Sequence, residues 1–536
     1  MSNYIDKSLS IANPNPHNLG PTERLAILVG LLGLSIAGLH AGGVSFASTG
    51  MTFTIAFTLM GMSLLWYSFQ HYATRKAGVK NDGVWFSSLA SRGVIGWILG
   101  IVLTGFYVLL YWFPEVLGMG KAGAANTGII SLFDPLSNVF HGKPASQWFM
   151  YGTMYTFAIF FFGIKFIYKY RQNRYQVIRT LSVMFFQLFL AYFIPEILSG
   201  LNGGFEGNWF DMDLKNQWPL DYDFAQQWHI DNMLSAGNIG WFFFIWSLLL
   251  VFVVSPYLTY KYGKRWYCSW VCGCGGLAET AGDPWRHLSD KSINAWKIER
   301  WMIHAVLLFS FVMTIAVVYS YLGKDPSKYS LTQTGFTWII IGLLLALAAA
   351  YAFLQKKNAD GNKNKIYLAS GSATLVAVLL GMNWLFGSGN AFFLGGDAFK
   401  SSYGFYVGAL FSGVVGVGFY PIMGSRVWCR FGCPMAAILG LQQKLFSKFR
   451  ITTNGGQCIS CGNCSTYCEM GIDVRSYAQK GQNIVRASCV GCGICSAVCP
   501  RGVLRLENGS EDIFSKTDEY KAIHISNEGV KIDLLR

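Results

Sequence analysis

Two cysteine-rich stretches near the C-terminus decide how this chain is interpreted: residues 458–468 are CISCGNCSTYC, and residues 489–500 are CVGCGICSAVCP. Each stretch spaces its cysteines as C-x2-C-x2-C-x3-C, and only the second is closed by a proline, Pro500. Together they hold eight of the thirteen cysteines of a 536-residue chain, and all thirteen lie after residue 267. Such clustering, in a chain too long and too poor in cysteine for a disulfide scaffold, predicts metal ligation.

The doubled spacing is the pattern of bacterial ferredoxin domains that bind two [4Fe–4S] clusters, in which the fourth cysteine of each run binds the other cluster. Zinc sites usually use two pairs of ligands, and disulfides are disfavoured on the reducing side of a membrane. Glu469 stands where a proline would close the first run, which affects the loop rather than the ligands. The first cluster would be bound by Cys458, Cys461, Cys464 and Cys499, and the second by Cys489, Cys492, Cys495 and Cys468.

The rest of the chain has the composition of a membrane protein. Hydrophobic residues make up 52% and charged residues only 13% of the sequence, which excludes an ordinary soluble enzyme and a disordered chain. A transmembrane helix needs about 20 mostly apolar residues. Ten segments meet that description: 24–42, 49–70, 93–113, 149–168, 177–198, 238–258, 301–322, 334–354, 366–386 and 403–423.

The distribution of positive charge predicts the orientation of these helices. With the N-terminus in the cytoplasm, the inner loops and adjoining helix ends carry 20 Lys and Arg, whereas the outer loops carry 6. The positive-inside rule then places both termini in the cytoplasm. Because these basic loops account for the net charge of +14, we expect no nucleic-acid partner.

The predicted fold is a polytopic α-helical membrane protein with about ten transmembrane helices, cytoplasmic termini and a C-terminal α+β ferredoxin domain. Its parts are a cytoplasmic N-terminal segment (1–23), helices one to six (24–258) with an acidic outer loop (199–237), a cytoplasmic loop with a first cysteine motif (259–300), helices seven to ten (301–423), a second cysteine motif with an amphipathic helix (424–450), the ferredoxin domain (451–506) and a C-terminal tail (507–536).

Two features on the outer side are candidates for function. The acidic loop 199–237 is interpreted either as a folded cap or as a docking surface for a partner outside the membrane. Glu196, near the outer end of the fifth helix, is an intramembrane acid, and such residues are candidates for proton paths linked to a quinone. The alternative for Glu196 is a helix end capped by solvent.

Two further cysteine motifs each follow a predicted helix: residues 263–274 are GKRWYCSWVCGC, and residues 424–434 are GSRVWCRFGCP. Aligned, they share a glycine, an arginine, an aromatic residue before the first cysteine and the spacing C-x3-C, which indicates an internal repeat. Cysteines four residues apart lie on one face of a helix, so the two pairs could form one four-thiolate site at the cytoplasmic edge of the membrane. That site would contain Cys268, Cys272, Cys429 and Cys433, while Cys274 has no counterpart.

The sequence leaves the occupant of this site open. A third iron–sulfur cluster, copper and a dithiol–disulfide pair are each compatible with four thiolates. The structural alternative is that these cysteines are small buried residues at a helix end. Arg265, Arg426 and Arg430 are expected to lower the pKa of nearby thiols.

These motifs resemble those of the membrane polyferredoxins of the NapH and NosR type, which join several helices, C-x3-C-P motifs and a two-cluster ferredoxin domain. The resemblance covers residues 263–280 and 424–506, and the first motif departs from it, with Gly273 in place of proline and the additional Cys274. It implies a protein of the bacterial inner membrane that exchanges electrons with the quinone pool or a membrane redox partner. A related branch, the polyferredoxin of cytochrome oxidase assembly, is associated with copper reduction.

Three hypotheses follow. The first is membrane electron transfer through iron–sulfur clusters, the second is a cupric reductase that serves cofactor assembly, and the third is a redox sensor that acts through a partner. The outer loop has no copper-collecting run rich in Met or His, which disfavours the second, and no output domain is recognisable, which disfavours the third. The sequence assigns no catalytic residue.

Overall fold

The computed structural model describes most of the chain, namely residues 19–44, 47–73, 93–121, 124–201, 214–215, 217–235, 237–324, 329, 331–357, 363–386, 390–392, 394–509, 524–526 and 529–531. Within these residues, eight helices are long and apolar enough to cross a membrane. They span Pro21–Ala41, Thr49–Tyr72, Val94–Trp112, Gln147–Tyr170, Arg174–Gly200, Gly240–Tyr262, Ile293–Lys324 and Gln333–Ala350. These helices confirm the prediction of a multi-pass membrane protein.

Several of the spans consist of more than one contiguous helical segment. The segments are α1 (Pro21–Ala41), α2 (Thr49–Ser68) with the π-helical η1 (Phe69–Ala73), α4 (Val94–Trp112), α7 (Gln147–Tyr170), α8 (Arg174–Phe185) with the π-helical η2 (Phe186–Phe193) and α9 (Ile194–Leu201), α11 (Gly237–Leu249) with the π-helical η5 (Leu250–Val254) and α12 (Ser255–Tyr262), α15 (Ile293–Lys324) and α16 (Gln333–Lys357). Short helices join them: α5 (Gly128–Ser131), α6 (Asp134–His141), α10 (Gln227–Ser235), α13 (Arg265–Cys268), α14 (Gly273–Thr280) and the 3-10 helix η6 (Asp283–Leu288).

The last two predicted spans differ from the other eight. The segment predicted at 366–386 is helix α17 (Lys363–Leu385), within which Ala373–Met382 is a shorter apolar stretch. The segment predicted at 403–423 is not one helix, so that prediction was wrong. It begins as α18 (Gly396–Tyr403), continues as the π-helical η7 (Gly404–Val415) and, after a turn, resumes as α19 (Tyr420–Met423).

The break in this last segment has a packing cause. A side chain at Gly418 would approach the Thr104 hydroxyl of α4 to 2.5 Å, so the two backbones approach closely there. Glycine permits this approach but stabilises a helix poorly. The segment keeps its direction across the break, because Gly413 lies against Tyr107 and Gly418 against Thr104 of the same helix α4.

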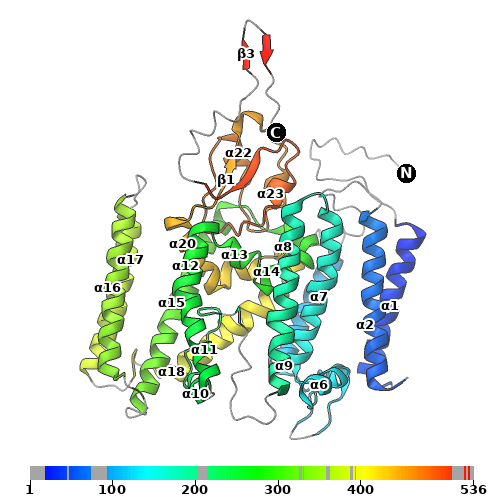
Figure 1. The fold of residues 1–536 in the computed structure, drawn as a ribbon, viewed down its shortest axis with the longest axis horizontal. Coiled ribbons are helices and arrows are strands. Elements are labelled where there is room, and N and C mark those ends of the chain that lie inside the picture. The colour runs from blue at the N-terminus through cyan, green and yellow to red at the C-terminus, as the bar shows by residue number, and fades with distance from the viewer. Residues whose placement is uncertain are drawn as a thin grey trace.

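The helices stand side by side in a layer, and a small cysteine-rich domain sits at one end of that layer (Figure 1). The α1–α2 and α16–α17 hairpins form its opposite edges. Large apolar side chains are exposed on the outer helices, among them Leu28, Ile101 and Trp338. Exposed apolar belts of this kind suit contact with lipid.

The cysteine-rich domain is held together by one antiparallel strand pair and short helices. Strand β1 (Arg450–Thr453) pairs with β2 (Leu504–Glu507), with Arg450 opposite Glu507. Between the strands lie the 3-10 helix η9 (Gly455–Gln457), α21 (Asn463–Thr466), α22 (Val474–Gln479) and α23 (Ile494–Ala497). Beyond it, a hairpin of β3 (His524–Ser526) and β4 (Gly529–Lys531) lies within the predicted tail.

Residues 202–213, 216 and 236 of the acidic loop 199–237 lie outside the described residues, and its role as a docking surface stays a prediction. The described part of the loop packs against the bundle. Trp218 donates a hydrogen bond to Thr314 of α15 at 3.0 Å, and Asp223 lies 3.3 Å from Lys400 of α18.

Candidate metal centres

The first group of ferredoxin cysteines lines a single pocket. The pocket encloses about 350 Å³, including its mouth, and Cys458, Cys461, Cys464 and Cys499 all lie on its wall. Three of these cysteines come from the first run and the fourth from the second run. The structure thus brings together the four residues grouped from sequence, in a space with no competing polar ligands other than Ser460, Arg475 and Arg501.

The second group repeats this arrangement. Left-handed Gly462 (φ 82°) precedes α21 in the first run, and left-handed Gly493 (φ 75°) precedes α23 in the second. The Cys495 thiol interacts electrostatically with Cys492, Cys489 and Cys468, and to a smaller extent with Cys464 of the first group. Three of these four cysteines belong to the second run, and Cys468 comes from the end of the first.

The second group faces the helix bundle, whereas the first faces away from it. The turn between α7 and α8 is capped by Asn173, which accepts a hydrogen bond from the Gln176 amide at 3.2 Å. The first turn of α8 presents Tyr175, which donates to the carbonyl of Gly491 at 2.8 Å, and Gln176, which donates to that of Cys492 at 2.9 Å. The cysteine loop of the second group is therefore bonded directly to the membrane helices.

The two C-x3-C motifs share one backbone design. Each begins after a glycine of positive φ, 68° at Gly263 and 97° at Gly424. In each, the amide of the second cysteine donates to the carbonyl of the residue before the first cysteine: Cys272 to Tyr267 at 2.8 Å, and Cys433 to Trp428 at 3.0 Å. This agreement supports the internal repeat inferred from sequence.

The cysteine pairs do not, however, lie on one face of a continuous helix, so that expectation was wrong. The first cysteine belongs to a short helical turn, α13 or the π-helical η8 (Trp428–Gly432). The second is the extended N-cap residue of the next helix, α14 for Cys272 and α20 (Pro434–Phe446) for Cys433. The turn between the cysteines allows both thiols of a motif to point to the same side. Helix α20, expected to be amphipathic, is buried around most of its first two turns.

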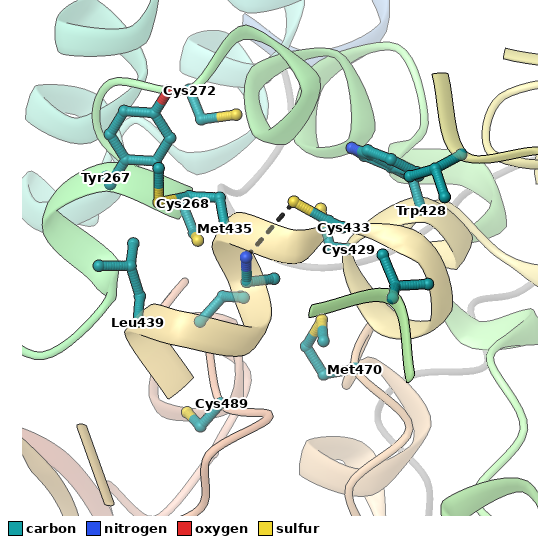
Figure 2. Close-up of a cluster of buried hydrophobic side chains, with 14 of the residues drawn as sticks. Tyr267, Cys268, Cys272, Trp428, Cys429, Cys433, Met435, Leu439, Met470 and Cys489 are labelled. Carbon is teal, nitrogen blue, oxygen red and sulfur yellow. Dashed lines mark hydrogen bonds between the residues drawn. The ribbon is translucent and has the colours of Figure 1, made fainter. Parts of the chain in front are cut away.

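The four thiols of the motifs converge in the interior. Figure 2 shows Cys268, Cys272, Cys429 and Cys433 directed into the space between the two motifs, above Met435 and Leu439. Each of the four residues is between 5% and 9% exposed. The Cys433 sulfur accepts a hydrogen bond from the Ala436 amide at 3.4 Å, which is the dashed contact in Figure 2.

Sulfur spacing separates the possible occupants. All thirteen cysteines are among the described residues, and no three of their sulfurs lie within 4.8 Å of one another. Four thiolates on one tetrahedral zinc ion, with Zn–S bonds of about 2.3 Å, would stand about 3.8 Å apart. Both the ferredoxin groups and the four-cysteine site are therefore wider than a site for a single four-coordinate ion, as ligation of a polynuclear cluster requires.

The charges around the four-cysteine site differ from the sequence-based expectation. Burial raises the pKa of the Cys268 thiol to about 12 and also raises the pKa of Cys429 and Cys433. Of the three arginines expected to lower thiol pKa values, only Arg426 reaches a sulfur, at 3.6 Å from Cys429. Burial outweighs its effect.

The other two arginines have different partners. Arg265 donates to Asn508 at 2.9 Å, and Arg430 pairs with Glu299 at 2.7 Å. At Cys272 the sign reverses, because a hydrogen bond from the Cys274 thiol lowers the pKa of Cys272.

A buried ionic network, which sequence reasoning missed, connects the ferredoxin domain to the first motif. Glu469, in the place of the missing proline, is fully buried and pairs with Arg286 at 2.8 Å and Arg426 at 3.1 Å. Glu279 of α14 pairs with Arg426 and Arg179. A charged residue directly after a cluster cysteine was the signal that could have revealed this network.

Asp283 extends the network toward α7. It pairs with Lys169 at 2.5 Å and with Arg286 at 3.2 Å. Burial raises the pKa of Asp283, but Lys169 and Arg286 outweigh burial and hold this pKa at about 2.

The first motif lies deeper than the predicted membrane edge. A side chain added at Gly273 would meet Gln187 and Tyr155, at 2.4 and 3.3 Å. Both residues lie near the middle of their spans, Arg174–Gly200 and Gln147–Tyr170. The segment that carries Cys272 and Cys274 thus enters the bundle and does not rest on its surface.

Comparison with known proteins agrees with these sites. A family described as "4Fe-4S dicluster domain" matches residues 457–504, which contain all eight ferredoxin cysteines. The chain is 24% identical over 235 residues to "Putative electron transport protein YccM" of Escherichia coli (strain K12). The match covers 43% of this chain and 48% of the relative, so the chain spans about half the length of the curated relative it matches. No solved structure matches the chain significantly.

Together, the membrane helices and the matched domain indicate a membrane protein that binds iron–sulfur clusters.

Proposed function

We propose that this protein transfers electrons between a membrane redox partner, most simply quinone, and two [4Fe–4S] clusters bound by its ferredoxin cysteines. We further propose that the four-cysteine site holds a third iron–sulfur cluster. Iron–sulfur clusters supply one-electron redox chemistry whose potential depends on nearby charges and hydrogen bonds. The protein's own residues position these groups and control their surroundings.

The observation that carries the proposal is the attachment of the second cysteine loop to the first C-x3-C motif. Ser269, next to Cys268, donates a hydrogen bond to the carbonyl of Val490 at 2.8 Å. From the other motif's helix α20, Gln443 donates to the carbonyl of Cys489 at 2.9 Å. The loop that bears three ligands of the second centre is therefore fixed by both motifs, and this brings the redox groups together in the protein interior.

The fit of the residues to iron–sulfur groups rests on three features: pocket-lining thiols, buried thiols and wide sulfur spacing. The same spacing disfavours a copper ion bound by three or four of the thiols. The cupric reductase is disfavoured on this ground, and the metal content of the purified chain tests it.

The orientation proposal places the ferredoxin domain in the cytoplasm and the helices in the bacterial inner membrane. The basic turn between α7 and α8 and the basic segment that follows α12 both contact this domain. The positive-inside rule assigns such basic loops to the cytoplasm.

Two carboxylate–imidazole pairs, one buried and one partly buried, support quinone as the partner. His71 lies 3.0 Å from Glu23 near one end of the α1–α2 hairpin, and His141 lies 2.6 Å from Glu196 at the opposite end of the bundle. Oxidation of a quinol releases protons, and a carboxylate beside an imidazole can accept them. Glu196, singled out from sequence, is thus paired with a histidine rather than capped by solvent alone.

The test is iron and acid-labile sulfide per chain, together with an EPR redox titration, on the full chain purified without oxygen. We expect about twelve irons in the wild type and about eight in a Cys429→Ser/Cys433→Ser variant. Cys274→Ser is the matched control, because it removes a neighbouring thiol outside the two pairs. About eight irons in all three proteins would overturn the third cluster, and stoichiometric copper lost only in the double variant would establish the copper alternative.

The quinone part is tested separately in proteoliposomes. A reduced short-chain quinol should reduce the clusters of the wild type. Of the two variants Glu23→Gln and Glu196→Gln, only the one that removes the pair serving the quinone should slow this reduction. Clusters that are present by EPR but not reduced or oxidised by any quinone would overturn the quinone assignment while leaving the iron–sulfur assignment intact.

A further inference from the structure

Two charged side chains lie between a cysteine of the second ferredoxin group and a cysteine of the four-cysteine site. A carboxylate oxygen of Glu469 lies within 4.8 Å of the Cys492 sulfur. Glu469 also pairs with Arg426, whose Nε lies 3.1 Å from Oε1 of the carboxylate. Arg426 in turn donates through Nη1 to the Cys429 sulfur at 3.6 Å. One carboxylate and one guanidinium thus connect the two thiols.

This connection is held rigidly. Glu469 and Arg426 are both 1% exposed or less. Arg426 also donates to the carbonyl of Cys268 at 3.1 Å and pairs with Glu279, and Glu469 also pairs with Arg286. Planar guanidinium groups with several partners lose little freedom on binding, so the charges keep fixed positions relative to both thiols.

We propose that Glu469 and Arg426 are positioning residues that couple the group bound at Cys492 electrostatically to the group bound at Cys429. This inference rests on the proposed function and adds to it a specific control of redox potential. It also explains why a glutamate occupies the position after Cys468, where a proline would provide no charge and could not reach Arg426.

The sign of the effect at each site follows from the charges. In a buried site, a fixed charge a few ångströms away acts through a low effective dielectric and is screened little by salt. The negative Glu469 opposes addition of an electron at Cys492, whereas the positive Arg426 favours addition of an electron at Cys429. Because Arg426 contacts both Glu469 and Cys429, the two charges lie close to both thiols, and each acts on both groups, with a sign opposite to that of the other.

The cluster of Glu279, Glu469 and Cys492 is a poor binding site for a divalent cation. Glu279, Glu469 and Cys492 are close enough to bind a metal ion. Both carboxylates, however, are already paired with arginines, namely Arg426 with each, Arg179 with Glu279 and Arg286 with Glu469. Three guanidinium groups would repel a cation, and they provide the carboxylates with the positive partners that a metal would otherwise supply.

The experiment measures the reduction potential of each EPR-resolved cluster in the full chain carrying Glu469→Gln. Glutamine keeps the size and the hydrogen-bonding oxygen but removes the charge. We expect the potential of the centre at Cys492 to rise by about 59 mV, which is a tenfold change in its equilibrium with a one-electron mediator. Arg426→Gln should shift the four-cysteine centre by a similar factor in the opposite direction.

The matched control is Asp283→Asn, an equally isosteric neutralisation in the same network. Asp283 pairs with Lys169 and Arg286, and among the described contacts it bonds no redox cysteine. It should move both potentials by clearly less than Glu469→Gln does. Equal shifts from both variants, or no shift from Glu469→Gln, would show that Glu469 is only a structural anchor.

A double variant separates the electrostatic effect from misfolding of the single variants. Glu469→Gln/Arg426→Gln removes one charge of each sign, so it leaves less uncompensated charge than either single variant. Each potential should lie closer to its wild-type value than in the single variant that shifts it, whereas a centre that keeps the full shift of its single variant would contradict the coupling. Iron content and a thermal melt, measured on every variant, separate failure of this inference from failure of the proposed function, which would appear as missing clusters in the wild type.

Discussion

The two C-x3-C motifs have the same backbone and different second halves, and the contrast shows what each half does. Both begin at a glycine of positive φ and end with a cysteine at a helix N-cap. The second motif continues with Pro434, whose ring suits the first position of a helix. The first continues with Gly273 and Cys274, because a larger residue at 273 would collide with Gln187. The shared half places the thiols, and the variable half fits each motif to its neighbours.

The largest expected effect tests whether the motifs contribute equally. We expect Cys268→Ser/Cys272→Ser to lose about four irons per chain, as Cys429→Ser/Cys433→Ser does, because the four thiols line one site. Iron analysis and EPR on both double variants decide this. Loss of iron from only one pair would break the symmetry and show that the other pair is structural.

A smaller effect is expected where each motif begins. Gly263→Ala and Gly424→Ala place a β-carbon on a residue whose positive φ and ψ near 180° suit only glycine, which costs about 1–3 kcal/mol. At Gly424 the β-carbon would lie 2.8 Å from the backbone nitrogen of Ser289, whereas at Gly263 the nearest atoms are side-chain atoms of Gln443 and Phe449. We therefore expect Gly424→Ala to lower the melting temperature more, and the reverse order would contradict this account.

The asymmetric halves are compared by converting one motif into the other. Gly273→Pro gives the first motif the proline of the second, and we expect a loss of about 1–3 kcal/mol from the collision with Gln187. Gln187→Ala introduced together with it should recover part of that loss, although it removes the hydrogen bond to Thr156 at 3.1 Å. Thermal melts of the two variants and of Gln187→Ala alone measure the recovered stability. If no stability is recovered, the backbone itself excludes proline at this position.

The smallest expected effect concerns Cys274. No cysteine occupies the position equivalent to Cys274 in the second motif, so Cys274→Ala should keep every iron. The small cavity that it leaves should lower stability by about 1 kcal/mol or less. Loss of iron from Cys274→Ala would show that Cys274, and not only the two C-x3-C pairs, is needed to bind the cluster.

Local patterns in the sequence were sufficient for the membrane helices and the iron–sulfur domain. Apolar runs and cysteine spacing are short-range signals, and eight helices and the domain family confirm them. Long-range pairing was not predictable: Glu469 finds Arg286, 183 residues earlier in the chain, and nothing near Glu469 indicates that contact. The segment at 403–423 had the composition of a span, but the close approach of Gly418 to α4 interrupts its helix.

The depth of the first motif has an electrical consequence. Gly273, between Cys272 and Cys274, neighbours Tyr155 and Gln187, midway along the spans Gln147–Tyr170 and Arg174–Gly200. The pocket of Cys458 and Cys461 lies in the domain beyond the helix ends. A charge that crosses a whole membrane changes its energy by about 2.3 kcal/mol per 100 mV of membrane potential, and a charge that crosses part of it changes by that fraction. Reduction at the four-cysteine site would therefore depend on the voltage of the membrane, while reduction at the outlying pocket would not.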